Sequence, residues 1–259
     1  MRAATAFVPI VIFLCPAATL NNTRTMSAPS ASSTAIAQSQ ALTINPVHHA
    51  AIELEWNRLV ILVDPAAGSE RFKSFPPPDL ILITDIHGDH LDTITLRGLD
   101  LGKARIIAPQ AVMDLLPQDL KKITVPLANG ASTEALGIGI EAVPMYNMPD
   151  PHDPRHPKGR GNGYVITLGG ERIYISGDTE DIPEMRALRN IDVAFVCMNL
   201  PYTMTIYQAA SAVLAFKPHI VYPYHYRGKD GLSDVGHFKE LVADSNSAIE
   251  VRLVDWYKE

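Results

Sequence analysis

The chain has 259 residues, of which 47% are hydrophobic and 19% charged, and this suits one large folded domain with a substantial core. Its formal net charge is −6 at pH 7, and no cluster of Lys and Arg offers the basic surface that nucleic acid requires, so we expect no nucleic-acid partner. Cys197 is the only cysteine in the predicted domain, which excludes a disulfide within it.

Residues 1–25 have the pattern of a signal peptide. Arg2 precedes an apolar run at 6–15 that is shorter than a stable membrane span requires, and small residues follow the run. We therefore expect a secreted or periplasmic protein, whereas a start at Met26 would give a cytoplasmic one. Residues 26–40 are rich in Ser, Thr and Ala and are interpreted as a linker, so the folded domain is expected over 41–259.

The first half of the domain is predicted to be mainly strands. They are expected at residues 41–44, 50–56, 59–64, 80–83, 104–109 and 123–125. The strand at 80–83 is continuously apolar, which is typical of a strand covered on both faces. A helix at 110–116 lies between the last two strands, and this strand, helix, strand order indicates parallel pairing.

The second half alternates strands and helices. Strands are expected at residues 138–145, 163–168, 172–176, 191–196, 219–222 and 249–254, and helices at 180–190, 203–217 and 234–243. The first two of these strands are separated by residues 147–162, which are rich in Pro and Gly. A long polar loop in a compact domain is usually functional or disordered.

Residues 84–92, with the sequence TDIHGDHLD, follow the strand at 80–83 and hold four candidate metal ligands. These are Asp85, His87, Asp89 and His90. Imidazole nitrogens and carboxylate oxygens bind zinc, manganese and iron, and Gly88 permits the tight turn that brings such side chains together. The alternative is a polar loop that only caps a helix, with Asp92 as the N-cap residue. Two His and two Asp within six residues favour the metal site.

This segment resembles the His-x-His-x-Asp-His signature of the metallo-β-lactamase fold superfamily, with Asp85 in place of the first His. The resemblance covers residues 41–226 and is nearest to the branch of L-ascorbate-6-phosphate lactonase-like and N-acyl-phosphatidylethanolamine phospholipase D-like hydrolases. It implies an α/β fold, namely a four-layer αβ/βα sandwich of two mixed sheets with helices outside.

The resemblance also implies a centre of two divalent ions. The first ion would bind Asp85, His87 and a His from residues 147–162, the second would bind Asp89, His90 and His225, and Asp178 would bridge them. Either His152 or His156 can supply the loop ligand, and His156 is preferred because the Gly residues after it let the loop fold back. Zinc is expected, with manganese or iron as alternatives because the carboxylate of Asp85 is a harder ligand than imidazole.

The implied function is hydrolysis of a small-molecule ester, lactone or phosphodiester by a metal-bridging hydroxide, with Asp89 and Asp178 as the catalytic carboxylates. The alternative is a non-catalytic metal-binding or interaction protein on the same fold, because Asp85 replaces a His. Asp64 matches an Asp that lies beneath the metal loop in relatives, and it can equally be a residue that ends a strand. We expect His48 and His49 to pack in the core or lie at the surface, with the alternative that one of them points into the cleft.

Overall fold

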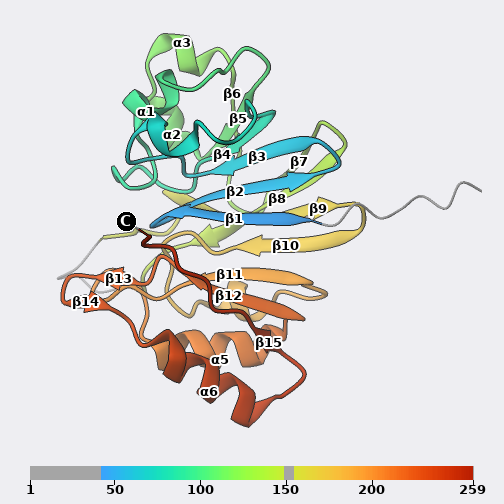
Figure 1. Cartoon of the computed structure of the whole chain (residues 1–259), viewed down its shortest axis with the longest axis vertical. Helices are drawn as coiled ribbons and strands as arrows, with labels where there is room; N and C mark the ends of the chain where they lie inside the picture. The colour runs from blue at the N-terminus through green and yellow to red at the C-terminus, as the bar shows by residue number, and fades with distance from the viewer. Residues whose placement is uncertain (1–41, 149–154, 259) are drawn as a thin grey trace, which may run out of the picture. The chain divides into compact units, whose positions relative to one another are not determined.

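The computed structural model describes residues 42–148 and 155–258, which contain two large β-sheets and the helices that cover them (Figure 1). The predicted signal peptide, the predicted linker and the alternative ligand His152 lie outside the described residues. Within the described part of the chain, no helix has the length and apolar character needed to cross a membrane.

The first sheet has six strands in the order β1-β2-β3-β4-β5-β6. They are β1 (Thr43–His48), β2 (Ala51–Trp56), β3 (Leu59–Val63), β4 (Leu80–Leu82), β5 (Arg105–Ala108) and β6 (Thr124–Pro126). Strands β1 to β3 pair antiparallel, and β3 to β6 pair in parallel, which confirms the predicted parallel crossover. Asn57 and Arg58 form the predicted turn between β2 and β3, and both have positive φ angles (49° and 66°), as tight hairpins favour.

The second sheet has seven strands in the order β15-β12-β11-β10-β9-β8-β7. They are β7 (Ser132–Ala135), β8 (Ile138–Met145), β9 (Gly161–Leu168), β10 (Glu171–Ile175), β11 (Val193–Cys197), β12 (Ile220–Tyr224) and β15 (Glu250–Val251). Strands β7 to β10 pair antiparallel, and β10, β11, β12 and β15 pair in parallel. A separate hairpin joins β13 (Arg227–Gly228) to β14 (Gly231–Leu232). Both large sheets are therefore mixed, as predicted.

The helices are short except for two. They are η1 (Ser69–Phe72), α1 (Thr93–Arg97), α2 (Gln110–Leu115), α3 (Gln118–Lys121), α4 (Pro183–Arg186), α5 (Ile206–Phe216) and α6 (Val235–Ser245). Asp92 caps α1, a role considered for it in the alternative interpretation of the loop, because its carboxylate accepts from the N–H groups of Ile94 and Thr95. Thr205 and Gln208 form a capping box at the start of α5.

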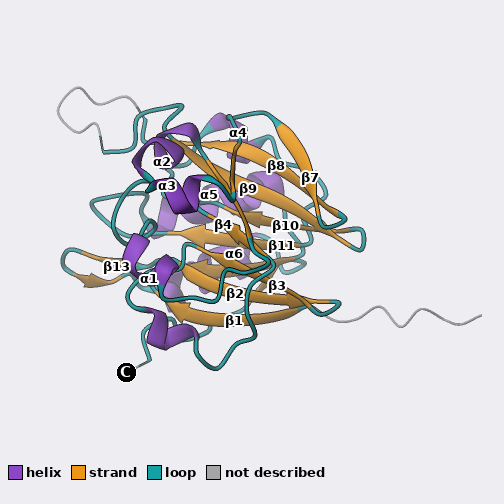
Figure 2. Ribbon diagram, turned by 90° about the horizontal axis from the view of Figure 1, so that it is seen from above, coloured by secondary structure: helices purple, strands orange, loops and turns teal. Residues whose placement is uncertain are grey.

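The two sheets pack face to face with helices on the outside (Figures 1 and 2). Successive side chains of a strand point to opposite faces, so Ile61 and Leu82 join the core cluster that contains residues of the second sheet. Leu62 and Ile81 instead pack against α1, α2 and α3. Residues of α5 and α6 cover the outer face of the second sheet. This arrangement confirms the predicted sandwich and explains why its central strands are continuously apolar.

Several elements differ from the sequence prediction. The helix predicted at 180–190 is only α4, which starts at Pro183 and ends before Asn190, a residue with positive φ. The strand predicted at 249–254 is only β15, because this edge strand pairs with β12 at two residues. The prediction missed η1, α3, β7, β13 and β14, which have two to four residues each and carry no clear periodicity.

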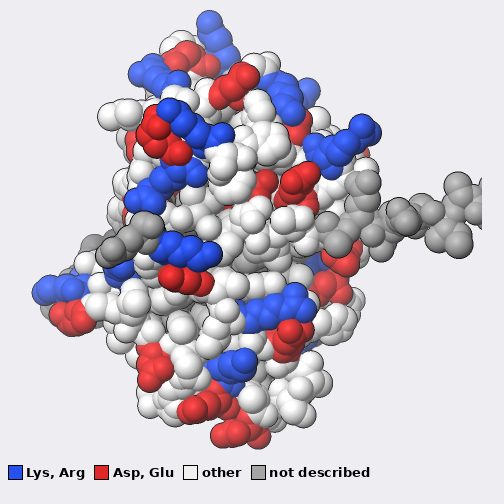
Figure 3. Space-filling view, viewed as in Figure 1, with Lys and Arg blue, Asp and Glu red and all other residues white. Residues whose placement is uncertain are grey.

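Charged side chains of both signs are interspersed on the face drawn in Figure 3. Several of them form exposed ion pairs, such as Arg97 with Asp119 and Arg252 with Glu250. Such pairs add little to stability because solvent screens them. The mixed charge agrees with the formal net charge of −6. The expected lack of a nucleic-acid partner stays a prediction.

Tyr164 links the two sheets at the end of β4. Its side chain is fully buried, and its hydroxyl donates to the carbonyl oxygen of Ile83 at 2.8 Å while it accepts from the amide of Asn162 at 3.3 Å. Burial raises the pKa of Tyr164, so its hydroxyl stays a donor. This contact holds the residue just before the predicted metal loop against β9.

We expect Tyr164→Phe to lower the free energy of unfolding by about 1–3 kcal/mol, because two buried polar groups lose their partner. Urea denaturation measures the change. Tyr207→Phe is the control, since Tyr207 is 61% exposed and its loss should change stability by less than about 0.5 kcal/mol. Equal effects of the two substitutions would show that the Tyr164 contact does not stabilise the sheet packing.

Candidate metal centre

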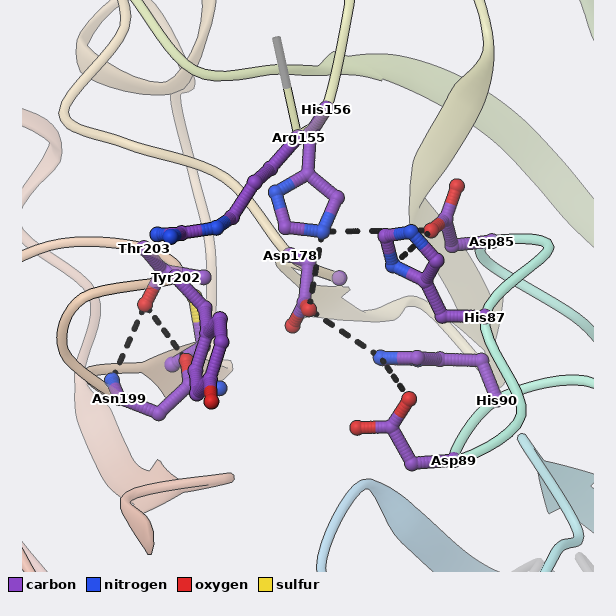
Figure 4. Close-up of polar contacts among 12 residues, drawn as sticks. Asp85, His87, Asp89, His90, Arg155, His156, Asp178, Asn199, Tyr202 and Thr203 are labelled. Atoms are coloured by element: carbon purple, nitrogen blue, oxygen red, sulfur yellow. Dashed lines mark hydrogen bonds and ion pairs between the residues drawn. The ribbon is translucent and has the colours of Figure 1, made fainter. Parts of the chain in front are cut away.

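The candidate site lies where several strands end. The loop at 84–92 follows β4, and Asp178, Asn199 and His225 follow β10, β11 and β12. Strands β10, β11 and β12 are parallel, so their carboxyl ends meet at one edge of the sheet, where open α/β sheets place ligands. The sequence thus brings polar residues from distant segments to one place (Figure 4).

Asp178 lies among three histidines from three different loops. Its Oδ2 is 3.2 Å from Nε2 of His156 and 3.3 Å from Nε2 of His90, and its Oδ1 is 3.1 Å from Nε2 of His225. All four side chains are at least 96% buried. One carboxylate therefore faces ligand atoms on both sides, as a bridging ligand must.

The predicted ligands fall into two groups. The ligand atoms of Asp85, His87 and His156 lie within 4.8 Å of one another, and so do those of His90, Asp178 and His225. Asp89 lies beside the second group, with its Oδ2 3.4 Å from Nε2 of His225. All seven predicted residues thus surround one region, which opens to a cavity of about 550 Å³.

Within the described part of the chain, two buried ligand atoms make no hydrogen bond, namely Nε2 of His156 and Oδ1 of Asp178. The imidazole of His156 donates through Nδ1 to Oδ1 of Asn147 at 2.7 Å, which leaves the lone pair of Nε2 directed at Asp178. Buried polar atoms are nearly always satisfied, and a cation between these two atoms would satisfy both. The residues present therefore fit a divalent metal ion.

Asp64 lies beneath the metal loop. Its Oδ2 accepts from Nδ1 of His90 at 2.8 Å and from the Thr84 hydroxyl at 2.6 Å, and its Oδ1 accepts from the Thr84 N–H at 2.7 Å. This pairing fixes the ring of His90 so that Nε2 faces Asp178. Of the two sequence interpretations of Asp64, the structure favours the one in which it supports the site.

The carboxylates and imidazoles of the site shift each other's pKa. Burial opposes charge on His90, but the carboxylates of Asp178, Asp64 and Asp89 outweigh burial and raise the pKa of His90 well above its ordinary value. Burial also opposes the charge of Asp178, but His225 and His90 outweigh it and hold the pKa of Asp178 well below its usual range. The site therefore keeps negative oxygens that attract cations.

Asp85 has a partner that the sequence analysis did not identify. The guanidinium of Arg160 donates to both carboxylate oxygens, from Nε to Oδ1 at 3.0 Å and from Nη2 to Oδ2 at 2.8 Å. Nδ1 of His87 lies 3.0 Å from the same Oδ2. Arginine does not belong to any metal-ligand motif, and its position between Gly159 and Gly161 was the only available signal.

His49 takes the less favoured of the positions expected from the sequence. The core or the surface was preferred, but the structure places it at the site, with Nε2 3.3 Å from Oδ2 of Asp89 and its ring 4.0 Å from that of His225. Its positive φ of 55° turns the chain between β1 and β2 and directs the ring toward the cavity. Its other nitrogen lies 3.0 Å from the hydroxyl of Tyr257, so it orients Asp89 from outside the predicted ligand set.

The chain is similar to a protein family, to curated relatives and to a solved structure. Residues 59–226 match the family described as the beta-lactamase superfamily domain. UPF0173 metal-dependent hydrolases of Pyrococcus abyssi and Thermococcus onnurineus are 30% and 33% identical to the chain, over 79% and 78% of it and 93% and 92% of the relatives. A solved structure of a metal-dependent hydrolase from Parabacteroides distasonis is 42% identical, covers 82% of this chain and 92% of its own, and has a TM-score of 0.73.

We expect Asp178→Ala to lower metal affinity at least ~100-fold. Losing a residue that binds the metal directly should cost more than the 10–100-fold loss seen when a residue that only hydrogen-bonds to a ligand is removed. Elemental analysis after dialysis against a fixed metal concentration measures the bound ions. Asp230→Ala, at an exposed carboxylate, is the control that should keep the wild-type content. Unchanged metal content in the Asp178 variant would remove Asp178 from the ligand set.

Asp64→Asn should lower metal affinity by about 10–100-fold without unfolding the protein, because His90 loses the carboxylate that orients its ring. Competition with a chromogenic chelator measures the affinity. Asp92→Asn is the matched control, since Asp92 lies in the metal loop with His90 and caps α1. If both variants bind metal equally well, the contact between Asp64 and His90 does not tune the site.

Proposed function

The chain belongs to the beta-lactamase superfamily domain family and to the UPF0173 metal-dependent hydrolases, and from this premise we propose that it hydrolyses an ester, lactone or phosphodiester bond of a small molecule. The observation that carries the proposal is the buried carboxylate of Asp178, which faces His156, His90 and His225 at the edge of a cavity. Such a constellation has no structural role that apolar residues would not fill better.

We propose two divalent ions held by the predicted ligands, with zinc first and manganese or iron as alternatives. The donor set of imidazole and carboxylate suits all three metals. Bound ions would lower the pKa of water and so supply a nucleophile at neutral pH, and they would polarise the scissile bond. Asp89 lies at the cavity, where its Oδ2 is held by His49 and His225 and can orient the attacking group.

Asn199 supplies a neutral donor to the reaction. It is 98% buried and follows β11, and its backbone N–H donates to the Thr203 hydroxyl at 3.0 Å. That hydroxyl in turn donates to Oδ1 of Asn199 at 2.6 Å, which leaves the amide NH₂ as the group that faces the cavity (Figure 4). A fixed donor beside the ligands can stabilise negative charge that develops on the substrate oxygen.

Two arginines line the same cavity and favour an anionic substrate. Arg155 stacks over the ring of Tyr202 at 5.0 Å and donates to the carbonyl of Pro201, and Arg227 stacks over the ring of Tyr257 at 4.2 Å. Guanidinium groups recognise phosphate and carboxylate oxygens through paired hydrogen bonds. A phosphodiester, or a lactone that carries an acidic group, therefore fits this cavity better than a neutral ester.

The rival proposal is a non-catalytic metal-binding protein, and the pairing of Asp85 with Arg160 favours it because one predicted ligand is engaged. A screen of metal-reconstituted protein against p-nitrophenyl esters, lactones and bis-p-nitrophenyl phosphate separates the two. The hydrolase requires metal-dependent turnover that Asp178→Ala abolishes. Metal binding without turnover of any of the three classes would favour the rival.

With a substrate from that screen, we expect Asn199→Ala to lower kcat about 100-fold, which is the cost of losing one oxyanion donor. KM should change less, because the donor acts mainly on charge that develops in the transition state. Elemental analysis of the same variant is the control and should give the wild-type metal content. A loss of metal together with activity would show that Asn199 supports the ligands and does not contact the substrate.

A further inference from the structure

The ion pair of Asp85 and Arg160 is buried and held in place by the surrounding backbone. The carboxylate is fully buried, and the guanidinium side chain is 17% exposed. The backbone N–H of Asn162 donates to the Thr84 carbonyl oxygen at 2.9 Å, which fixes the start of β9 beside the metal loop. A Cβ at Gly161 would lie 2.9 Å from the same oxygen, so the absence of a side chain at 161 allows this close approach.

This pair engages the atoms that would bind the first ion. Both oxygens of Asp85 accept from Arg160, and Oδ2 also lies 3.0 Å from Nδ1 of His87. Nε2 of His87 is 3.5 Å from Nη2 of Arg160. An ion at the group of Asp85, His87 and His156 would therefore lie beside a permanent positive charge and compete with it for one carboxylate.

The other group has no such competitor. Among residues 42–148 and 155–258, the ion-pair partners of Asp89 and Asp178 are all histidines, whose protons a metal ion can displace. Arginine keeps its charge at any pH the protein tolerates, whereas imidazole does not. The two groups thus differ in charge although both contain His and Asp.

We propose that Arg160 makes the two metal positions unequal. The group of His90, Asp178 and His225, with Asp89 beside it, binds a divalent ion tightly. The group of Asp85, His87 and His156 binds a second ion weakly, because the guanidinium already balances the carboxylate there. This inference rests on the metal centre proposed above, and its test measures metal binding instead of turnover.

Calorimetric titration of the metal-free full chain with Mn²⁺ tests the proposal, and the paramagnetic spectrum of bound Mn²⁺ reports whether a second ion lies beside the first. We expect the wild type to bind one ion at least ~100-fold more tightly than the next. Arg160→Gln removes the charge but keeps a hydrogen-bond donor. It should raise the affinity of the weaker site and so lower the ratio of the two dissociation constants at least ~10-fold. Arg155→Gln removes a charge from the same cavity but leaves the pair of Asp85 and Arg160 in place. Its ratio of dissociation constants should therefore equal that of the wild type.

Arg160→Lys keeps the charge and covers the case in which the Gln variant does not fold. In this variant the ratio of the two dissociation constants should stay as large as in the wild type. A smaller ratio would show that the charge at residue 160 does not cause the difference between the two sites. The inference would be overturned if the two wild-type sites bind with equal affinity, or if Arg160→Gln leaves the ratio of their dissociation constants unchanged. Either result would leave the proposed metal-dependent hydrolase intact. Failure of the wild type to bind Mn²⁺ or Zn²⁺ at all would instead overturn the proposed metal centre and this inference together.

Discussion

The site depends on the need to compensate carboxylates that are buried between two sheets. Asp64, Asp85 and Asp178 are each at most 3% exposed, and an isolated charge at such a depth would cost several kcal/mol, on the order given for buried ions. Each has a different partner. Asp64 has a histidine and a threonine, Asp85 has an arginine and a histidine, and Asp178 has three histidines. The choice of partner sets what each carboxylate can bind.

The fold meets this constraint by bringing strand ends together at one edge. Parallel β10, β11 and β12 direct their carboxyl ends to the site, and β4 does so from the other sheet. The loops after β4 and β10, which belong to different sheets, approach closely at Gly177, whose φ is +60° and where a Cβ would lie 3.2 Å from Cβ of Thr84. Tyr164 and Asn162 satisfy the backbone carbonyls at this junction. Small residues and buried hydrogen bonds thus set the distance between loops that share the ligands.

Charge is distributed unevenly around the cavity. Carboxylates and imidazoles occupy the floor, the guanidinium of Arg160 lies beside Asp85, and Arg155 and Arg227 line the wall with Asn199. These charges are the basis for our proposal that a cation binds the floor and an anionic substrate binds the wall. The same fold supports different chemistry in different relatives, so we derive the proposed function from these side chains and not from the sandwich itself.

The sequence by itself determined the main strands and the clustered ligands, because both depend on local patterns: apolar runs fix which strands are buried, and six residues after β4 contain two His and two Asp. The sandwich itself was expected only because this segment resembles the signature of a known superfamily. The sequence also identified Asp178, His225 and His156 through their positions after strands or beside glycines, although their role as ligands stays a proposal. Only the tertiary structure placed Arg160, His49 and Asn199 at the site. Arg160 and Asp85 are 75 residues apart in the chain, and no periodicity links them. Their contact is decided by how two sheets pack, which is a long-range property that no local pattern encodes.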